Sequence, residues 1–188
     1  MSHITNETNL YVKYGQWLAR NWKNTTFYET PKIAVRETGS RIIATLDLEN
    51  RYFLSSLYAI YPKSVGEQVL LKYLLGLLNW SLATYYLKII ALDITKGAST
   101  KFPTNQIARL PIRIIDFSDP KDKACHDRMV KLVEQMLSLH KQLVAAKTPD
   151  EKIRIQRQID ATDQQIDRLV YELYGLTEKE IQIVGERT

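Results

Sequence analysis

The chain has 188 residues, of which 45% are hydrophobic and 25% charged, so it can bury a core and is not a disordered tail. Its single cysteine, Cys125, excludes an internal disulfide, and no apolar leader is recognised at its start, so we expect a cytoplasmic location. The net charge of +5 belongs to the front part: residues 1–120 hold 14 Lys and Arg against 9 Asp and Glu, and residues 121–188 hold 12 of each.

Short strands are expected in the first third of the chain. Tyr11–Trp22 indicates an aromatic-rich helix or an extended arm. Alternating apolar residues predict strands at Lys32–Arg36 and Arg41–Leu46, joined by a hairpin turn at Glu37–Ser40. A third strand is predicted at Tyr52–Tyr61.

A long buried helix and a further strand are expected next. Glu67–Ala91 is apolar on nearly all sides, as in a helix packed by several neighbours. Polar residues that recur through it argue against a membrane span: Lys72, Asn79, Ser81, Thr84 and Lys88. Lys96–Lys101 is a Gly/Ser/Thr loop, and Ile107–Ile115 predicts a strand whose proline favours an edge position. A linker at 116–123 follows.

The last third predicts an antiparallel helical hairpin. Apolar residues alternate three and four apart, the spacing of a coiled-coil seam, along two arms: Met129, Leu132, Met136, Leu139 and Leu143, then Ile155, Ile159, Thr162, Ile166, Leu169 and Leu173. Thr148 and Glu151 form a capping box around Pro149, and Gly175 ends the second arm. A second capping box, Thr177 to Glu180, begins a short helix. The prediction is thus an α+β chain with a recognition domain at 1–120 and a hairpin at 121–188.

Patterns of catalytic residues are missing. The chain has no Gly-rich phosphate loop, no nucleophile elbow, and no metal-binding spacing among its histidines, His3, His126 and His140. Asp160, Asp163 and Asp167 recur at helical spacing, where a solvated charged face is the usual explanation. A binding module is therefore favoured. A scaffold that assembles through the hairpin, and an enzyme whose site is built from distant residues, are the alternatives.

Two loops of the basic front part carry the residue types that contact DNA. Phosphates are bound by cations, hydroxyls and backbone N–H groups, and base edges by Arg, Lys, Asn and Gln. The first loop offers Lys32, Arg36, Thr38, Gly39, Ser40 and Arg41. The second offers Lys96, Gly97, Ser99, Thr100 and Lys101, with Asn105 and Gln106 as candidate adenine contacts. The alternative is that both glycines only make turns, with charged neighbours that solvate them, and that Arg36 neutralises Glu37 or Glu29.

Four stretches together resemble the TaqI-like C-terminal specificity domain of adenine-N6 DNA methyltransferases and type IIG restriction-modification enzymes. They are residues 31–47, residues 70–88, the loop through Phe102-Pro103 to the Leu110-Pro111-Ile112 turn, and residues 157–181. The resemblance runs from about Trp17 onward and implies sequence-specific recognition of duplex DNA for a methyltransferase or nuclease located elsewhere. It also implies that the hairpin is a spacer that docks on the catalytic partner.

The chain departs from those enzymes because it holds no (Asn/Asp)-Pro-Pro-Tyr motif, no cofactor-binding Gly motif and no PD-(D/E)xK pattern. We therefore expect no cofactor in this chain, and the resemblance implies S-adenosylmethionine and Mg²⁺ for the missing catalytic part. That part is either the remainder of a longer polypeptide or a separate subunit.

Overall fold

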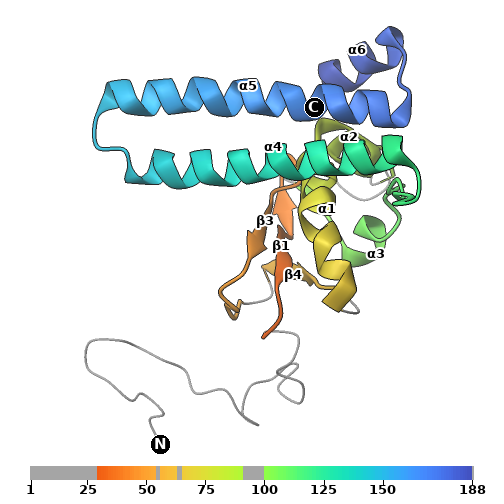
Figure 1. Ribbon diagram of the computed structural model, residues 1–188, viewed down its shortest axis with the longest axis horizontal. Helices are drawn as coiled ribbons and strands as arrows, with labels where there is room; N and C mark the ends of the chain where they lie inside the picture. Colours follow the sequence, from red (N-terminus) through yellow and green to blue (C-terminus); the bar gives the residue numbers. More distant parts are fainter. Residues whose placement is uncertain (1–28, 54–55, 63–64, 91–99, 188) are drawn as a thin grey trace, which may run out of the picture.

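The computed structural model describes residues 29–53, 56–62, 65–90 and 100–187. The fold is α+β, with a small antiparallel sheet beneath two long antiparallel helices (Figure 1). The elements in chain order are β1 (Lys32–Arg36), β2 (Thr38–Gly39), β3 (Ala44–Asp47), β4 (Leu57–Ile60), the 3-10 helix η2 (Val65–Val69), α1 (Leu70–Asn79), α2 (Ser81–Ile90), β5 (Thr100–Lys101), α3 (Thr104–Ile107), α4 (Pro120–Ala145), α5 (Pro149–Tyr174) and α6 (Glu178–Arg187). The arm predicted at Tyr11–Trp22 lies outside the described residues.

Three strands form the main sheet in the order β3-β1-β4, with both pairings antiparallel. In this register Val35 lies opposite Ala44 on one side and Tyr58 on the other. The prediction for β1 is confirmed, but β3 and β4 are shorter than the alternation suggested. β3 starts late because the backbone N–H of Ile42 turns away from the sheet and donates to the Thr84 hydroxyl, at 3.1 Å.

The helix predicted as one element at Glu67–Ala91 is broken, which corrects that expectation. Trp80 has an extended backbone with φ −77° and ψ 151°, so α1 ends before it and α2 begins after it. The break turns Asn79 toward the sheet edge, where its amide oxygen accepts from Ala44 N at 2.8 Å and its NH₂ donates to Ala44 O at 2.9 Å. Among the residues described, no helix has the length and apolar run that a bilayer crossing needs.

The strand predicted at Ile107–Ile115 is wrong. The short helix α3 ends at Ile107 and the chain then continues without regular structure to Ile115. Two tyrosine hydroxyls take the place of a neighbouring strand: Tyr73 donates to Arg113 O at 2.9 Å, and Tyr174 donates to Pro111 O at 2.7 Å. Side chains of α1 and α5 thus bond backbone groups of Pro111 and Arg113 that a neighbouring strand would otherwise bond.

The antiparallel helical hairpin is confirmed, and its local signals act as predicted. Thr148 accepts from Glu151 N at 3.3 Å, while the Glu151 carboxylate reaches back to Lys147 N. Gly175 ends α5 in the left-handed region at φ 62°, where only glycine is free of strain. The Thr177 N–H donates to the Glu180 carboxylate at 2.8 Å at the start of α6. The closed end of the hairpin projects past the sheet (Figure 1).

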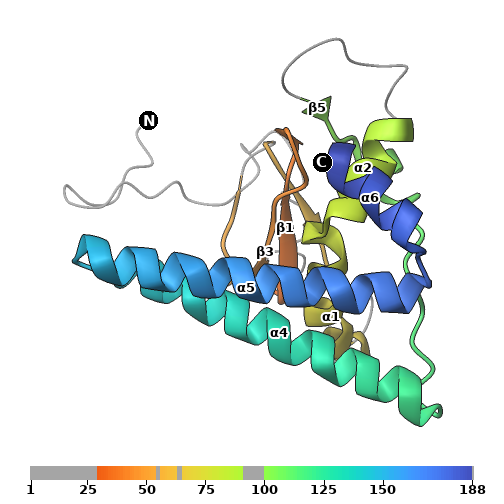
Figure 2. The same cartoon turned by 90° about the horizontal axis from the view of Figure 1, so that it is seen from above.

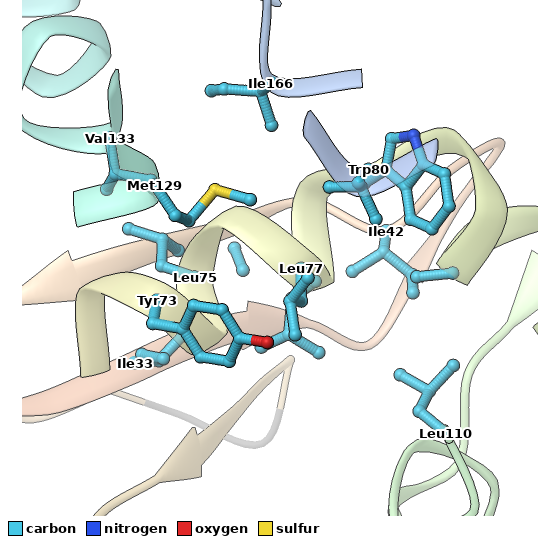
Figure 3. Close-up of a cluster of buried hydrophobic side chains, with 14 of the residues drawn as sticks. Ile33, Ile42, Tyr73, Leu75, Leu77, Trp80, Leu110, Met129, Val133 and Ile166 are labelled. Carbon is cyan, nitrogen blue, oxygen red and sulfur yellow. The ribbon is translucent and has the colours of Figure 1, made fainter. Parts of the chain in front are cut away.

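One hydrophobic core joins the sheet to the base of the hairpin. α1 lies between them, with Ile33 of β1 on one side and Met129 and Val133 of α4 on the other (Figure 3). Ile166 of α5 closes the same cluster. This core contains residues from both sides of position 120. The domain boundary expected between residues 120 and 121 therefore stays a prediction.

Asp167 does not lie on a fully solvated face, in contrast to the expectation from its spacing. It is half-buried, whereas Asp160 and Asp163 are exposed. Burial, together with the nearby Asp163 charge, raises the pKa of Asp167 to about 6. This carboxylate therefore destabilises the folded chain when it is ionised.

Candidate nucleic-acid interface

The two loops nominated by the sequence meet in a two-stranded antiparallel ladder. β2 pairs with β5, so that Thr38 lies opposite Lys101 and Gly39 opposite Thr100. The ladder continues into a backbone hydrogen bond from Phe102 N to Glu37 O, 2.8 Å long, and the Phe102 side chain is fully buried in the core. β5 and the neighbouring end of β1 lie on the side of the molecule away from α4 and α5 (Figure 2).

Most of the nominated residues that the structure describes are exposed around this ladder. We call them, together with the half-buried Gly39 between them, the β2–β5 surface, which comprises Arg36, Thr38, Gly39, Ser40, Arg41, Lys101 and Asn105. The turn at Gly39 is so tight that a Cβ at this position would lie 2.9 Å from Arg41 O, which is too close for any other residue type. Lys96, Gly97 and Ser99 lie outside the described residues, and of Thr100 only the backbone is described.

Lys32 does not belong to this surface, which corrects the sequence-based assignment. Its side chain is fully buried, with Nζ 2.8 Å from the carboxylate of Asp47, its cross-strand partner in the register. The ammonium also lies 5.7 Å from the centre of the Phe53 ring. Burial of Asp47 opposes ionisation, but Lys32 and the backbone N–H groups of Glu49 and Arg51 outweigh it and lower the pKa of Asp47. Lys32 is therefore a structural cation that phosphate cannot reach.

Gln106 is also misassigned as a base contact. Its side chain is only 6% exposed, and Oε1 is buried without a hydrogen-bond partner among the described residues. Its neighbour Asn105 is exposed, because successive residues of α3 face different sides. Asn105 thus remains the candidate adenine contact of this pair.

Glu37 is the residue of this region that sequence reasoning missed. Its Oε1 accepts from the Tyr58 hydroxyl at 2.8 Å and lies 2.8 Å from Lys101 Nζ. The hydrogen bonds from Lys101 and Tyr58 lower the pKa of Glu37, and burial together with Glu37 raises the pKa of Tyr58 to about 12. Glu37 is therefore ionised at neutral pH. The signal available in the sequence was a carboxylate placed between Arg36 and Arg41.

A groove of about 490 Å³ lies between β3, α1 and the hairpin. Arg41 is at one side of it, and Asp160 and Asp163 of α5 line the other. Among the residues that the structure describes, no group of three or more His, Cys, Asp or Glu side chains could hold a metal ion. The aspartates repel phosphates, so this side of the molecule is less suited to DNA than the β2–β5 surface.

Comparison with known proteins gives a family match for the part of the chain that contains this ladder. The sequence model of the TaqI-like C-terminal specificity domain family matches residues 2–112, which include both β2 and β5 and end before the hairpin. The chain is also similar to the type II restriction enzyme and methyltransferase RM.Eco57I of Escherichia coli, with 32% identity over 91 residues. That similarity covers 48% of this chain and 9% of the much longer relative.

Proposed function

The chain belongs to the family of TaqI-like C-terminal specificity domains, and from this premise we propose that its β2–β5 surface recognises a base sequence in duplex DNA. Recognition would direct adenine-N6 methylation, cleavage, or both, by a domain or subunit outside this chain. S-adenosylmethionine and Mg²⁺ would be bound by that catalytic part. The hairpin would serve as the spacer that holds the two parts together.

The pairing of β2 with β5 is the observation that supports this proposal most. It brings together two polar loops that are far apart in the sequence, on the side away from the hairpin (Figure 2). Arg36 is exposed there, and Arg41 is exposed where this surface borders the groove that faces α5, so both offer cations for phosphates. Asn105 offers an amide for a base edge. One surface thus combines the groups that position DNA with those that distinguish bases.

A scaffold is the second candidate function, because the closed end of the hairpin carries exposed apolar side chains. Val144 is 89% exposed and Ile153 is 51% exposed. Such side chains favour contact with another protein surface. A scaffold that assembles through this end would bind duplex DNA weakly or not at all.

A salt titration of duplex DNA binding separates the two functions. With about four to six phosphate contacts, the slope of log affinity against log salt is expected to lie near −4 to −5. The double variant Arg36→Ala/Arg41→Ala should make this slope shallower by about 2, since each lost phosphate contact removes about 0.9.

The matched control is Lys152→Ala/Arg154→Ala, which removes the same charge from exposed positions of α5. Its slope should equal that of the unmodified chain. Equal slopes for all three proteins would contradict the proposed surface. A shallower slope in the α5 variant alone would contradict it too. Binding that is absent in the unmodified chain would favour the scaffold.

A further inference from the structure

Glu37 is held more firmly than a solvated surface carboxylate. Its backbone N–H donates to Ser56 O at 3.0 Å, and its carbonyl accepts from Phe102 N at 2.8 Å. Its side chain is fixed by Tyr58 of β4 and Lys101 of β5. Backbone and carboxylate are therefore both positioned before any ligand binds, which is the condition for specific contacts at low entropic cost.

The two anchoring contacts leave one carboxylate oxygen for a ligand. Tyr58 and Lys101 both approach Oε1, and the described part of the chain offers no partner to Oε2. The side chain of Glu37 is 23% exposed, and Oε2 is not among the buried unpaired atoms of the described residues. Oε2 is thus an accessible hydrogen-bond acceptor with a full share of negative charge.

This charge matters because the surrounding surface is proposed to lie against DNA. An ionised carboxylate repels phosphates, so it does not suit a contact with the DNA backbone. The donors that a carboxylate can meet on duplex DNA are the exocyclic amino groups at base edges. In the major groove these are N4 of cytosine and N6 of adenine.

We propose that Glu37 is a specificity-determining residue whose Oε2 accepts a hydrogen bond from the exocyclic amino group of a base in the major groove, with cytosine as the best fit. Cytosine presents only a donor there, whereas adenine pairs its donor with an acceptor, the pattern that the Asn105 amide matches. Tyr58 and Lys101 act as positioning residues. The inference rests on the proposed function, because it needs the β2–β5 surface to contact DNA.

Glu37→Gln tests this proposal, because it predicts which base is lost and which bases are gained. Tyr58 and Lys101 are both donors, so they should hold the amide oxygen of the glutamine in place of Oε1. The NH₂ group then replaces Oε2 and turns the acceptor into a donor. The variant should lose its preference for cytosine at one position of the target by about tenfold or more, and should favour guanine or thymine there.

The experiment is selection of bound duplexes from a randomised DNA library with the full 188-residue chain, followed by sequencing. Circular dichroism and thermal melting check that each variant is folded. The matched control is Glu49→Gln, which changes an exposed carboxylate after β3, near Asp47 and at the other end of the sheet. The control should select the same consensus as the unmodified chain.

The outcomes separate the inference from the proposed function. An unmodified chain that enriches no sequence refutes the proposed function, and the inference with it. An unchanged consensus for a folded Glu37→Gln refutes the inference alone. A folded Glu37→Gln that loses base preference equally at every position also refutes it, because Glu37 would then only stabilise the ladder. If Glu37→Gln does not fold, Tyr58→Phe decides: it should weaken the cytosine preference without inverting it, and an unaltered preference refutes the inference.

Discussion

Thr84→Val tests how the loop that carries β2 is held in place. The Thr84 side chain is 2% exposed, and its hydroxyl accepts the backbone N–H of Ile42, which is itself 1% exposed. Valine has nearly the same shape, so the substitution opens no cavity and removes only the acceptor. The buried N–H of Ile42 then has no partner, which costs about 1–3 kcal/mol.

The expected result is a loss of about 2 kcal/mol in the free energy of unfolding. Urea unfolding followed by circular dichroism measures it. With a denaturant slope of about 2 kcal/mol per molar, the midpoint should fall by about 1 M. The slope itself should stay the same, since the variant folds to the same structure.

Asn79→Ala is the informative comparison, because Asn79 bonds Ala44, the first residue of β3 after this loop, but is exposed. Water can replace its two hydrogen bonds to Ala44, so the expected loss is below about 1 kcal/mol. Thr45→Val, at an exposed position of β3, controls for the chemical change and should shift stability by no more than about 0.5 kcal/mol. If Thr84→Val cost no more than this control, the Thr84 hydroxyl would not be what stabilises the buried N–H of Ile42.

The remaining predictions concern charges and the hairpin seam. The pKa of Asp167 in the folded chain, about 6, lies above its value in an unfolded chain, so the contribution of Asp167 to the stability of the folded chain falls as pH rises from about 4 to 6. Asp167→Asn should remove this fall and be more stable by about 2 kcal/mol at pH 7 but not at pH 4, and an equal gain at both pH values would contradict the assignment. Lys32→Met leaves the buried Asp47 carboxylate short of its partner and should cost about 3 kcal/mol in thermal or urea unfolding, whereas unchanged stability with lost DNA binding would return Lys32 to the interface. Gln135 donates to Thr162 across the hairpin at 3.2 Å, so a double-mutant cycle with Gln135→Ala and Thr162→Val should give a coupling near 1 kcal/mol, and zero coupling would exclude a role in register.

The hairpin was predictable because its signals are local. Caps such as Thr148 and Thr177 act within four residues, and Gly175 needs only its own backbone conformation. The seam spacing likewise depends on neighbours along one helix. The arrangement of these helices on the sheet was less accessible, since the shared core through Met129 and Ile166 depends on contacts between distant segments.

Hydrogen-bond partners that are distant in the sequence explain the wrong predictions of secondary structure. Asn79 and Thr84 looked like polar interruptions of one helix, but Asn79 bonds the backbone of Ala44 at the start of β3, and Thr84 bonds the backbone of Ile42 in the loop before it. The segment 108–115 has the composition of a strand, but the hydroxyls of Tyr73 and Tyr174, in place of a neighbouring strand, bond the carbonyls of Arg113 and Pro111.

Residue type alone also misled the choice of site residues. Lys32 is a cation at the start of a strand, and only the register shows that Asp47 lies opposite and buries it. Polar and basic residues in both loops can be read from the sequence, but the pairing of the loops through β2 and β5 was not predictable, because two-residue strands carry no periodic signal. The DNA contacts themselves stay a prediction.

Photo-crosslinking tests the central claim most directly. A photoreactive amino acid is placed at Thr38 on β2 and, in a separate variant, at Val144 near the closed end of the hairpin, which are both exposed. Irradiation with duplex DNA should crosslink the chain from Thr38 and not from Val144. Crosslinks from Val144 with none from Thr38 would place DNA on the hairpin and contradict the assignment of the β2–β5 surface.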